Sequence, residues 1–107
     1  MNAETLKGHL DLLLLAAVQS RPSHGYAIAE TLRARSSGAF DLPEGTLYPA
    51  LHRLEQAGLL SSRWAEVSGR RRRVYQLTRA GHRALAKRHQ DWRDFARAVH
   101  AVVEGPA

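Results

Sequence analysis

Apolar residues recur at helical spacing through the first part of the chain. From Thr5 to Gln19, leucine and alanine return every three or four residues, and further leucines widen the stripe until little polar surface is left. The pattern predicts a central helix that Pro22 stops. Ser23 then offers a hydroxyl cap for a second helix, which ends at the Ser-Ser-Gly cluster of residues 36–38.

Residues 42–60, LPEGTLYPALHRLEQAGLL, predict a third helix that Gly58 ends. One side of its helical wheel is apolar and consists of Leu47, Ala50, Leu51 and Leu54. The opposite side carries small, aromatic and basic groups, which are Gly45, Pro49, His52 and Gln56, with Tyr48 and Arg53 on its flanks. Because the ring of Pro49 pushes against the carbonyl group of Gly45, we expect a loosened first turn.

After Gly58 the apolar period falls to two, which predicts two strands, at residues 60–64 and 73–77. The segment EVSGRRRR joins them, and Ser68-Gly69 marks the turn. The first three of the four consecutive arginines are therefore expected at the tip of a hairpin, with the fourth in the second strand. The tip should be densely positive.

A final helix is predicted from the cap residue Thr78 to about Val103. About 25 helical residues extend ~37 Å, while a domain of about 100 residues has a radius of gyration of only ~13 Å. We therefore expect this helix to overhang its own core. Its apolar seam has heptad spacing, with Leu85, Trp92 and Val99 interleaved with Arg88, Phe95 and Val102.

An overhanging apolar seam needs a partner, and the simplest partner is a second copy of the chain. The expectation is a homodimer held by Leu85, Trp92, Phe95, Val99 and Val102. Arg88 interrupts the seam with a charge. The alternative is that the seam folds back onto the first helix of the same chain.

Composition limits the classes of protein that fit this pattern. With 107 residues and 44% apolar content, the chain suits one compact unit, made of a body at residues 1–77 and a C-terminal pairing helix at residues 78–107. There is no cysteine, so disulfides and cysteine-based zinc sites are excluded. The longest apolar run, Leu12–Val18, is shorter than the ~20 residues that a membrane helix needs. Since the acids near this run also disfavour a signal peptide, we expect a cytoplasmic protein.

Positive charge is concentrated in one segment. The formal net charge is +6, and residues 63–97 contain eleven Lys and Arg against three acids, a local net of +8 that leaves −2 for the rest. A concentrated positive segment favours a polyanion such as nucleic acid as the partner. A membrane surface and plain solubility are competing explanations.

Catalytic and metal-binding patterns are weak in this sequence. His82 and His89 are seven apart on one side of the last helix, but two imidazoles without a nearby cysteine make a poor metal site, so we expect no metal and no cofactor. The sequence has no nucleophile elbow, no phosphate-binding glycine loop and no convincing carboxylate pair. We expect that the protein is not an enzyme.

Three helices, a hairpin and a closing helix form the order of a winged helix-turn-helix, a mainly α fold whose third helix enters the DNA major groove. The segments HGYAIAETL, GTLYPALHRLEQAGLL and GRRRRVYQLTRAGHRAL resemble the corresponding motifs of PadR-family transcriptional regulators. The resemblance runs from about Leu6 to Val103 and fits the shorter subgroup, whose C-terminal part is one long dimerisation helix. The run of four arginines is more basic than the family usually shows.

The resemblance implies a homodimeric repressor that binds an inverted-repeat operator and releases it when an effector binds. It further implies a flat aromatic effector at the dimer interface, where Trp92 and Phe95 of two copies would border an apolar cavity. Ordinary dimer core is the alternative role for Trp92.

The expected partner of the third helix and the hairpin is double-stranded DNA. Expected contacts are Gly45, Thr46, Tyr48, Pro49, His52 and Arg53 of the third helix, Arg70, Arg71 and Arg72 of the hairpin, and Tyr26 and Lys7. Gly45 allows close approach of the backbone, and free N–H groups at the helix start can face a phosphate.

Several of these residues have a structural alternative. Gly45 and Pro49 would then only shape the entry into the helix. Tyr48 would be half-buried against the second helix. Arg53 would form a salt bridge to Glu30 or Glu55.

The leading hypothesis is a winged-helix repressor on a palindromic operator with half-sites ~34 Å apart. The alternative is a protein-interaction or metal-sensing adaptor whose winged helix has lost DNA contact. A nonspecific architectural DNA binder is a further alternative, and it would show little preference for a palindrome over random duplex.

Overall fold

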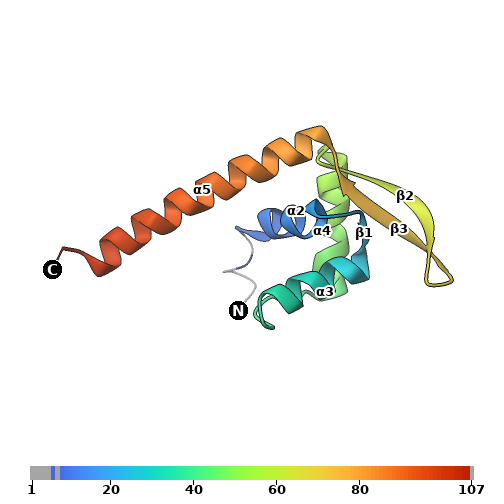
Figure 1. Ribbon diagram of the computed structural model, residues 1–107, viewed down its shortest axis with the longest axis horizontal. Helices are drawn as coiled ribbons and strands as arrows, with labels where there is room; N and C mark the ends of the chain where they lie inside the picture. The colour runs from blue at the N-terminus through green and yellow to red at the C-terminus, as the bar shows by residue number, and fades with distance from the viewer. Residues whose placement is uncertain (1–5, 7, 107) are drawn as a thin grey trace.

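The computed structural model describes residues 6 and 8–106 of the chain and measures 58 × 28 × 21 Å. The described elements are helices α2 (Leu10–Gln19), α3 (Gly25–Arg35), α4 (Glu44–Gln56) and α5 (Arg79–Glu104), and strands β1 (Ser23–His24), β2 (Leu60–Val67) and β3 (Arg70–Leu77). Helix α5 leaves the body of the molecule on one side and the β2–β3 hairpin leaves it on the other (Figure 1). The mainly α winged-helix fold expected from the sequence is confirmed.

Helix α2 is the centre of the core and packs against α3, α4, α5 and β3. Leu14 and Leu15 are fully buried there, as a helix with leucine on most of its surface requires. The described helix starts at Leu10, after a turn in which the His9 N–H donates to the Leu6 carbonyl oxygen at 2.9 Å. The predicted start at Thr5 lies outside the described residues.

The prediction that Ser23 caps the second helix is wrong. Ser23 and His24 form β1, which pairs antiparallel with Tyr75 and Val74 of β3, so the sheet has the order β1-β3-β2. The hydroxyl of Ser23 donates instead to the Arg21 carbonyl oxygen at 3.2 Å, and α3 begins without a side-chain cap. A strand of two residues is too short to show an alternating pattern, which is why sequence periodicity missed it.

The β2–β3 hairpin, which we call the wing, is longer than predicted. Its register is continuous from Leu60 opposite Leu77 to Val67 opposite Arg70. The turn is Ser68-Gly69, as predicted, and the φ values of 52° and 79° are those of the tight turns that match strand twist. All four arginines, residues 70–73, therefore lie within β3, so the predicted strand start at residue 73 is wrong. Arg70 directly follows the turn, and Arg71 and Arg72 lie farther along the strand.

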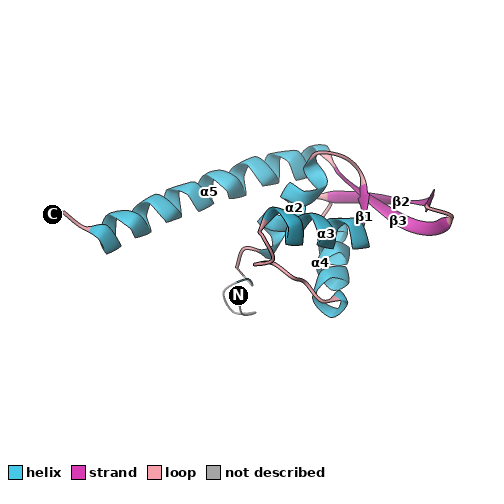
Figure 2. Cartoon of the chain, turned by 60° about the horizontal axis from the view of Figure 1, so that its bottom comes forward, coloured by secondary structure: helices cyan, strands magenta, loops and turns pink. Residues whose placement is uncertain are grey.

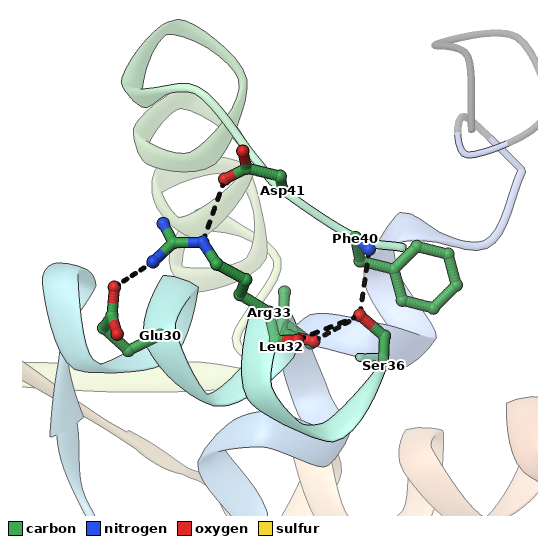
Figure 3. Close-up of polar contacts among 6 residues, drawn as sticks. All are labelled: Glu30, Leu32, Arg33, Ser36, Phe40 and Asp41. Carbon is green, nitrogen blue, oxygen red and sulfur yellow. Dashed lines mark hydrogen bonds and ion pairs between the residues drawn. The ribbon is translucent and has the colours of Figure 1, made fainter. Parts of the chain in front are cut away.

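The buried face of α4 matches the prediction. Leu47, Ala50, Leu51 and Leu54 point into the core together with Leu14, Ile28 and Leu60. The loop before α4 is held by Arg33 of α3 and by Ser36, the residue that follows this helix (Figure 3). Arg33 pairs with Glu30 and with Asp41, while the Ser36 hydroxyl donates to the Leu32 carbonyl oxygen at 2.7 Å and accepts the Phe40 N–H at 2.9 Å. These contacts fix the position at which α4 begins.

Helix α5 begins at the predicted cap and overhangs the core as expected. The Thr78 hydroxyl accepts the Gly81 N–H at 2.9 Å and donates to the Gly58 carbonyl oxygen at 2.6 Å. Twenty-six residues of helix span about 39 Å, and only their first part packs on α2 (Figure 2). Leu85, expected in the dimer seam, is 7% exposed and belongs to the protein's own core, so the exposed seam begins at Trp92.

Candidate nucleic-acid interface

One face of α4 is open to solvent and carries most of the expected contact residues. Gly45, Tyr48, Pro49, His52 and Arg53 are exposed, and Thr46 is half-buried. The opposite face is buried, because the apolar residues recur at helical spacing. The chemistry of the exposed face comprises a hydroxyl, a phenol, an imidazole and a guanidinium, all of which donate hydrogen bonds to phosphate oxygens or base edges.

The first turn of α4 is intact rather than loosened. The N–H groups of Thr46 and Leu47 both donate to the Pro43 carbonyl oxygen, at 2.9 and 3.0 Å, and the helix continues through Pro49. An added Cβ on Gly45 would have no neighbour within 4 Å. Gly45 is therefore not required by packing within the chain, and the space above it is free for a close approach from outside.

Tyr48 packs on the start of α3 and keeps part of its ring exposed. A Cβ on Gly25 would lie 2.5 Å from the Tyr48 Cε1 atom, so only glycine allows the ring to sit there. The residue as a whole is 42% exposed. The ring thus packs against the second helix, as in the structural alternative given for Tyr48. This packing also fixes the direction in which the exposed part of the ring faces.

Arg53 does form an ion pair, but with neither of the expected acids. Its Nη2 donates to the Asp11 carboxylate on α2. Glu30 pairs with Arg33, and Glu55 accepts the Ser62 hydroxyl at 2.7 Å. Arg53 and Asp11 are 42 positions apart, so no local pattern in the sequence points to this pair.

The two faces of the wing differ in chemistry. Residues directly opposite one another in the register share a face, which groups Trp64 and Arg73 with Arg71 on one side. The guanidinium groups of Arg71 and Arg73 each lie 5.3 Å from the centroid of the Trp64 ring, a cation–π geometry. Trp64 was not among the expected site residues, although its strand position opposite the arginine run is visible in the sequence. With 55% of its surface exposed, it forms part of the outer face of the wing.

A side-chain network joins this face of the wing to α4. Arg73 Nε donates to the Ser62 hydroxyl at 2.7 Å, and Ser62 in turn donates to Glu55 of α4. Arg73 Nη2 also lies 3.8 Å from Glu55. Arg73 therefore fixes the wing to α4, while Arg70 and Arg71 remain exposed for other partners.

Arg72 lies on the other face of the wing and is partly buried. Burial first, and the positive charge of Arg72 second, lower the pKa of His24 below its usual value. The ring of Tyr26 stacks on His24 with centroids 6.4 Å apart and is 62% exposed. Arg72 and Arg71 therefore lie on opposite faces of the wing, and Tyr26 is exposed to solvent. Lys7 lies outside the described residues.

The overhanging part of α5 carries an apolar seam that is exposed in the described part of the chain. Trp92, Phe95, Val99 and Val102 are all exposed, and Trp92 approaches His9 with ring centroids 6.3 Å apart. A groove of about 510 Å³ lies between α2 and α5, with Leu12, Leu85, His89 and Trp92 in its walls. Phe95 borders a hollow with His9 and Leu12, yet it stays 61% exposed, and Val99 and Val102 are also exposed among the described residues.

The described residues contain neither a metal-ligand cluster nor a membrane-spanning helix. Among residues 6 and 8–106 no group of three or more His, Cys, Asp or Glu is arranged to hold a metal ion. None of the described helices is both long enough and apolar enough to cross a membrane.

The fold and its motifs are shared with known regulators. The transcriptional regulator PadR-like family matches residues 14–87. Transcriptional regulator Rv3488 of Mycobacterium tuberculosis is 43% identical over 76 residues, which cover 71% of this chain and 68% of that protein. A PadR family transcription regulator of Clostridium difficile has a TM-score of 0.76 at 35% identity, covering 92% of this chain and 100% of that one. A PadR family regulator of Eggerthella lenta has a TM-score of 0.83 at 30% identity, covering 96% and 88%. This chain belongs to the PadR-like family of transcriptional regulators.

Proposed function

We propose that the protein is a cytoplasmic, homodimeric repressor that binds a palindromic operator through α4 and the wing and acts without catalysis. The observation that carries the proposal is the arrangement of its two exposed surfaces. The exposed face of α4 and the wing together form the proposed DNA-binding surface, which we call the reading surface. The apolar seam lies elsewhere, on the part of α5 that projects beyond the core that carries α4. Two copies joined along α5 would present two reading surfaces, the requirement for a two-fold symmetric operator.

The proposed DNA contacts follow from exposure and chemistry. In α4, Tyr48, His52 and Thr46 offer donors on the open side, and Gly45 and Pro49 leave space for the DNA backbone. In the wing, Arg70 and Arg71 point to opposite faces beside the turn, and both are exposed and carry charge that meets phosphates. Tyr26 and Arg53 lie at the border of this surface, and Arg72 is the arginine of the run that is turned inward.

The proposed dimer uses the exposed seam of Trp92, Phe95, Val99 and Val102. These positions repeat at heptad spacing, so a second copy of α5 packs along them as in a coiled coil. Residues 1–77 then form the DNA-reading part and residues 78–107 the pairing part of one compact unit. An aromatic effector would lie beside Trp92 and Phe95, where a hollow of about 280 Å³ borders both rings.

The test is a selection of duplexes from a random library, followed by affinity measurements on the selected site at several salt concentrations. We expect an inverted repeat with half-sites ~34 Å apart. If each subunit neutralises ~3 to 4 phosphates, the slope of log affinity against log salt is about −5 to −7. Recovery of duplexes without symmetry, or a slope near zero, would refute the proposal.

Gly45→Ala separates binding from stability. Because an added methyl group meets nothing within the chain and alanine favours a helix, we expect the melting temperature to stay constant or rise, by up to about 1 kcal/mol in the free energy of unfolding. On the selected duplex we expect at least a tenfold loss of affinity, since one misplaced contact of about 1.4 kcal/mol gives that factor. Unchanged affinity would show that the DNA backbone stays away from Gly45. Gln56→Ala, on the same helix near its other end, is the control.

A further inference from the structure

Asp11 lies between the helix proposed to read DNA and the helix proposed to form the dimer, and its carboxylate contacts both. One oxygen accepts a hydrogen bond from Arg53 Nη2 of α4, and the other lies 3.8 Å from Arg88 Nη1 of α5. The side chain of Asp11 is only 23% exposed, compared with 57% for Arg53 and 44% for Arg88. A partly buried carboxylate is less screened by water and salt than a surface pair.

The pairing changes what Arg53 offers to DNA. Arg53 lies on the flank of α4, and Asp11 belongs to α2, which packs on the buried side of α4. The hydrogen bond therefore turns the guanidinium toward α2 and sets a negative charge beside it. A phosphate is attracted less strongly to a neutralised pair than to a free guanidinium.

Arg88 shares the same carboxylate from a different element. It occupies a position of the heptad seam on α5, next to the segment where the exposed part of the seam begins. Two guanidinium groups on one carboxylate divide its charge between them, so a firmer contact with one weakens its hold on the other. Any displacement of α5 that moves Arg88 changes the hold of Asp11 on Arg53.

We propose that Asp11 is a positioning residue that withholds Arg53 from DNA, and that Arg88 weakens this hold from α5. The inference deepens the proposed function and rests on it. A rearrangement of the dimer, or a ligand bound along α5, would move Arg88. Through the Arg88–Asp11 and Asp11–Arg53 ion pairs, this movement would change how far Arg53 is available to DNA.

The first arm of the test compares Asp11→Asn in two backgrounds on the selected duplex. In the wild-type background we expect affinity to rise about fivefold, the effect of roughly 1 kcal/mol. The salt slope should become steeper by about 0.9 for each subunit, because the freed Arg53 reaches one more phosphate. In an Arg53→Gln background the same substitution should change affinity less than about twofold. Asp94→Asn, a carboxylate of equal charge on the outer side of α5, controls for net charge.

The second arm uses Arg88→Gln, with sedimentation to verify that the assembly is unchanged. Without its competitor, Asp11 should hold Arg53 more firmly, and we expect affinity to fall about twofold to threefold. In the Asp11→Asn background, Arg88→Gln should have no effect on affinity.

The inference is overturned if Asp11→Asn weakens binding, or if its gain is the same with and without Arg53. It is also overturned if Arg88→Gln acts equally in both backgrounds. Failure of the proposed function is distinguishable, because it appears in the wild type as a lack of sequence preference, whereas failure of this inference appears only in the variants.

Discussion

The double variant Arg70→Ala/Arg71→Ala is expected to lose about 100-fold in affinity for each half-site of the selected duplex. Both side chains are exposed on the wing, and neither has an acid partner that would neutralise it among the ion pairs of the described residues. A hydrogen bond to a charged group contributes about 1.5 kcal/mol, so two lost contacts give roughly two orders of magnitude. Fluorescence anisotropy at fixed salt measures the loss.

The salt dependence gives a second measurement on the same wing variant. Two fewer phosphate contacts per subunit reduce the slope of log affinity against log salt by about 1.8 per subunit. Arg83→Ala/Arg97→Ala removes the same charge from exposed positions of α5 and is the matched control. Equal losses in the two double variants would mean that net charge, rather than the wing, governs binding. Circular dichroism verifies that the fold is retained.

Val99→Asp is expected to convert the proposed dimer into monomers at micromolar concentration. In a symmetric dimer the substitution sets two carboxylates into one apolar seam, and burying an unpaired charge costs several kcal/mol. Val99 is 41% exposed and lies beyond the part of α5 that packs on the core, so the free energy of unfolding of the monomer should change by less than about 0.5 kcal/mol. Sedimentation velocity measures the assembly state.

The matched control for Val99→Asp is His100→Asp, which introduces a carboxylate at the next residue. His100 lies outside the heptad seam and is highly exposed, where it faces Glu104 at 3.7 Å. We expect this variant to remain a dimer. A Val99→Asp protein that stays dimeric would place the interface elsewhere, and loss of operator binding only in the monomeric variant would link pairing to DNA recognition.

Sequence periodicity located the helices and the hairpin, but it gave neither the full length of the strands nor the contacts between distant segments. The buried face of α4, the turn at Ser68-Gly69 and the cap at Thr78 each depend on neighbouring residues, and all three predictions are confirmed. Strand β1 depends on pairing with β3, some fifty positions away, so Ser23 gave the wrong signal. Local propensity is routinely overridden by such tertiary contacts.

The candidate site shows the same division. Exposure of Tyr48 and His52 follows from the helical wheel, whereas the packing of Tyr48 on Gly25 and the pairing of Arg53 with Asp11 require the folded chain. The strand assignment of Arg72 decides that it faces away from Arg71, which a run of identical residues does not reveal. Leu85 fits the heptad spacing but is buried within its own chain, because the core of the monomer extends one turn farther along α5 than the spacing alone indicates.

The joint at Thr78 has a consequence for which operators the protein accepts. One hydroxyl ties the end of α4 to the first turn of α5, and a side chain at Gly81 would collide with the carbonyl oxygen of Leu59 beside it. The angle at which α5 departs is thereby set within a few residues. In a two-fold assembly that angle fixes the distance between the two DNA-binding surfaces. The contacts at Thr78 and Gly81, rather than the residues that touch bases, would therefore determine the spacer length between half-sites.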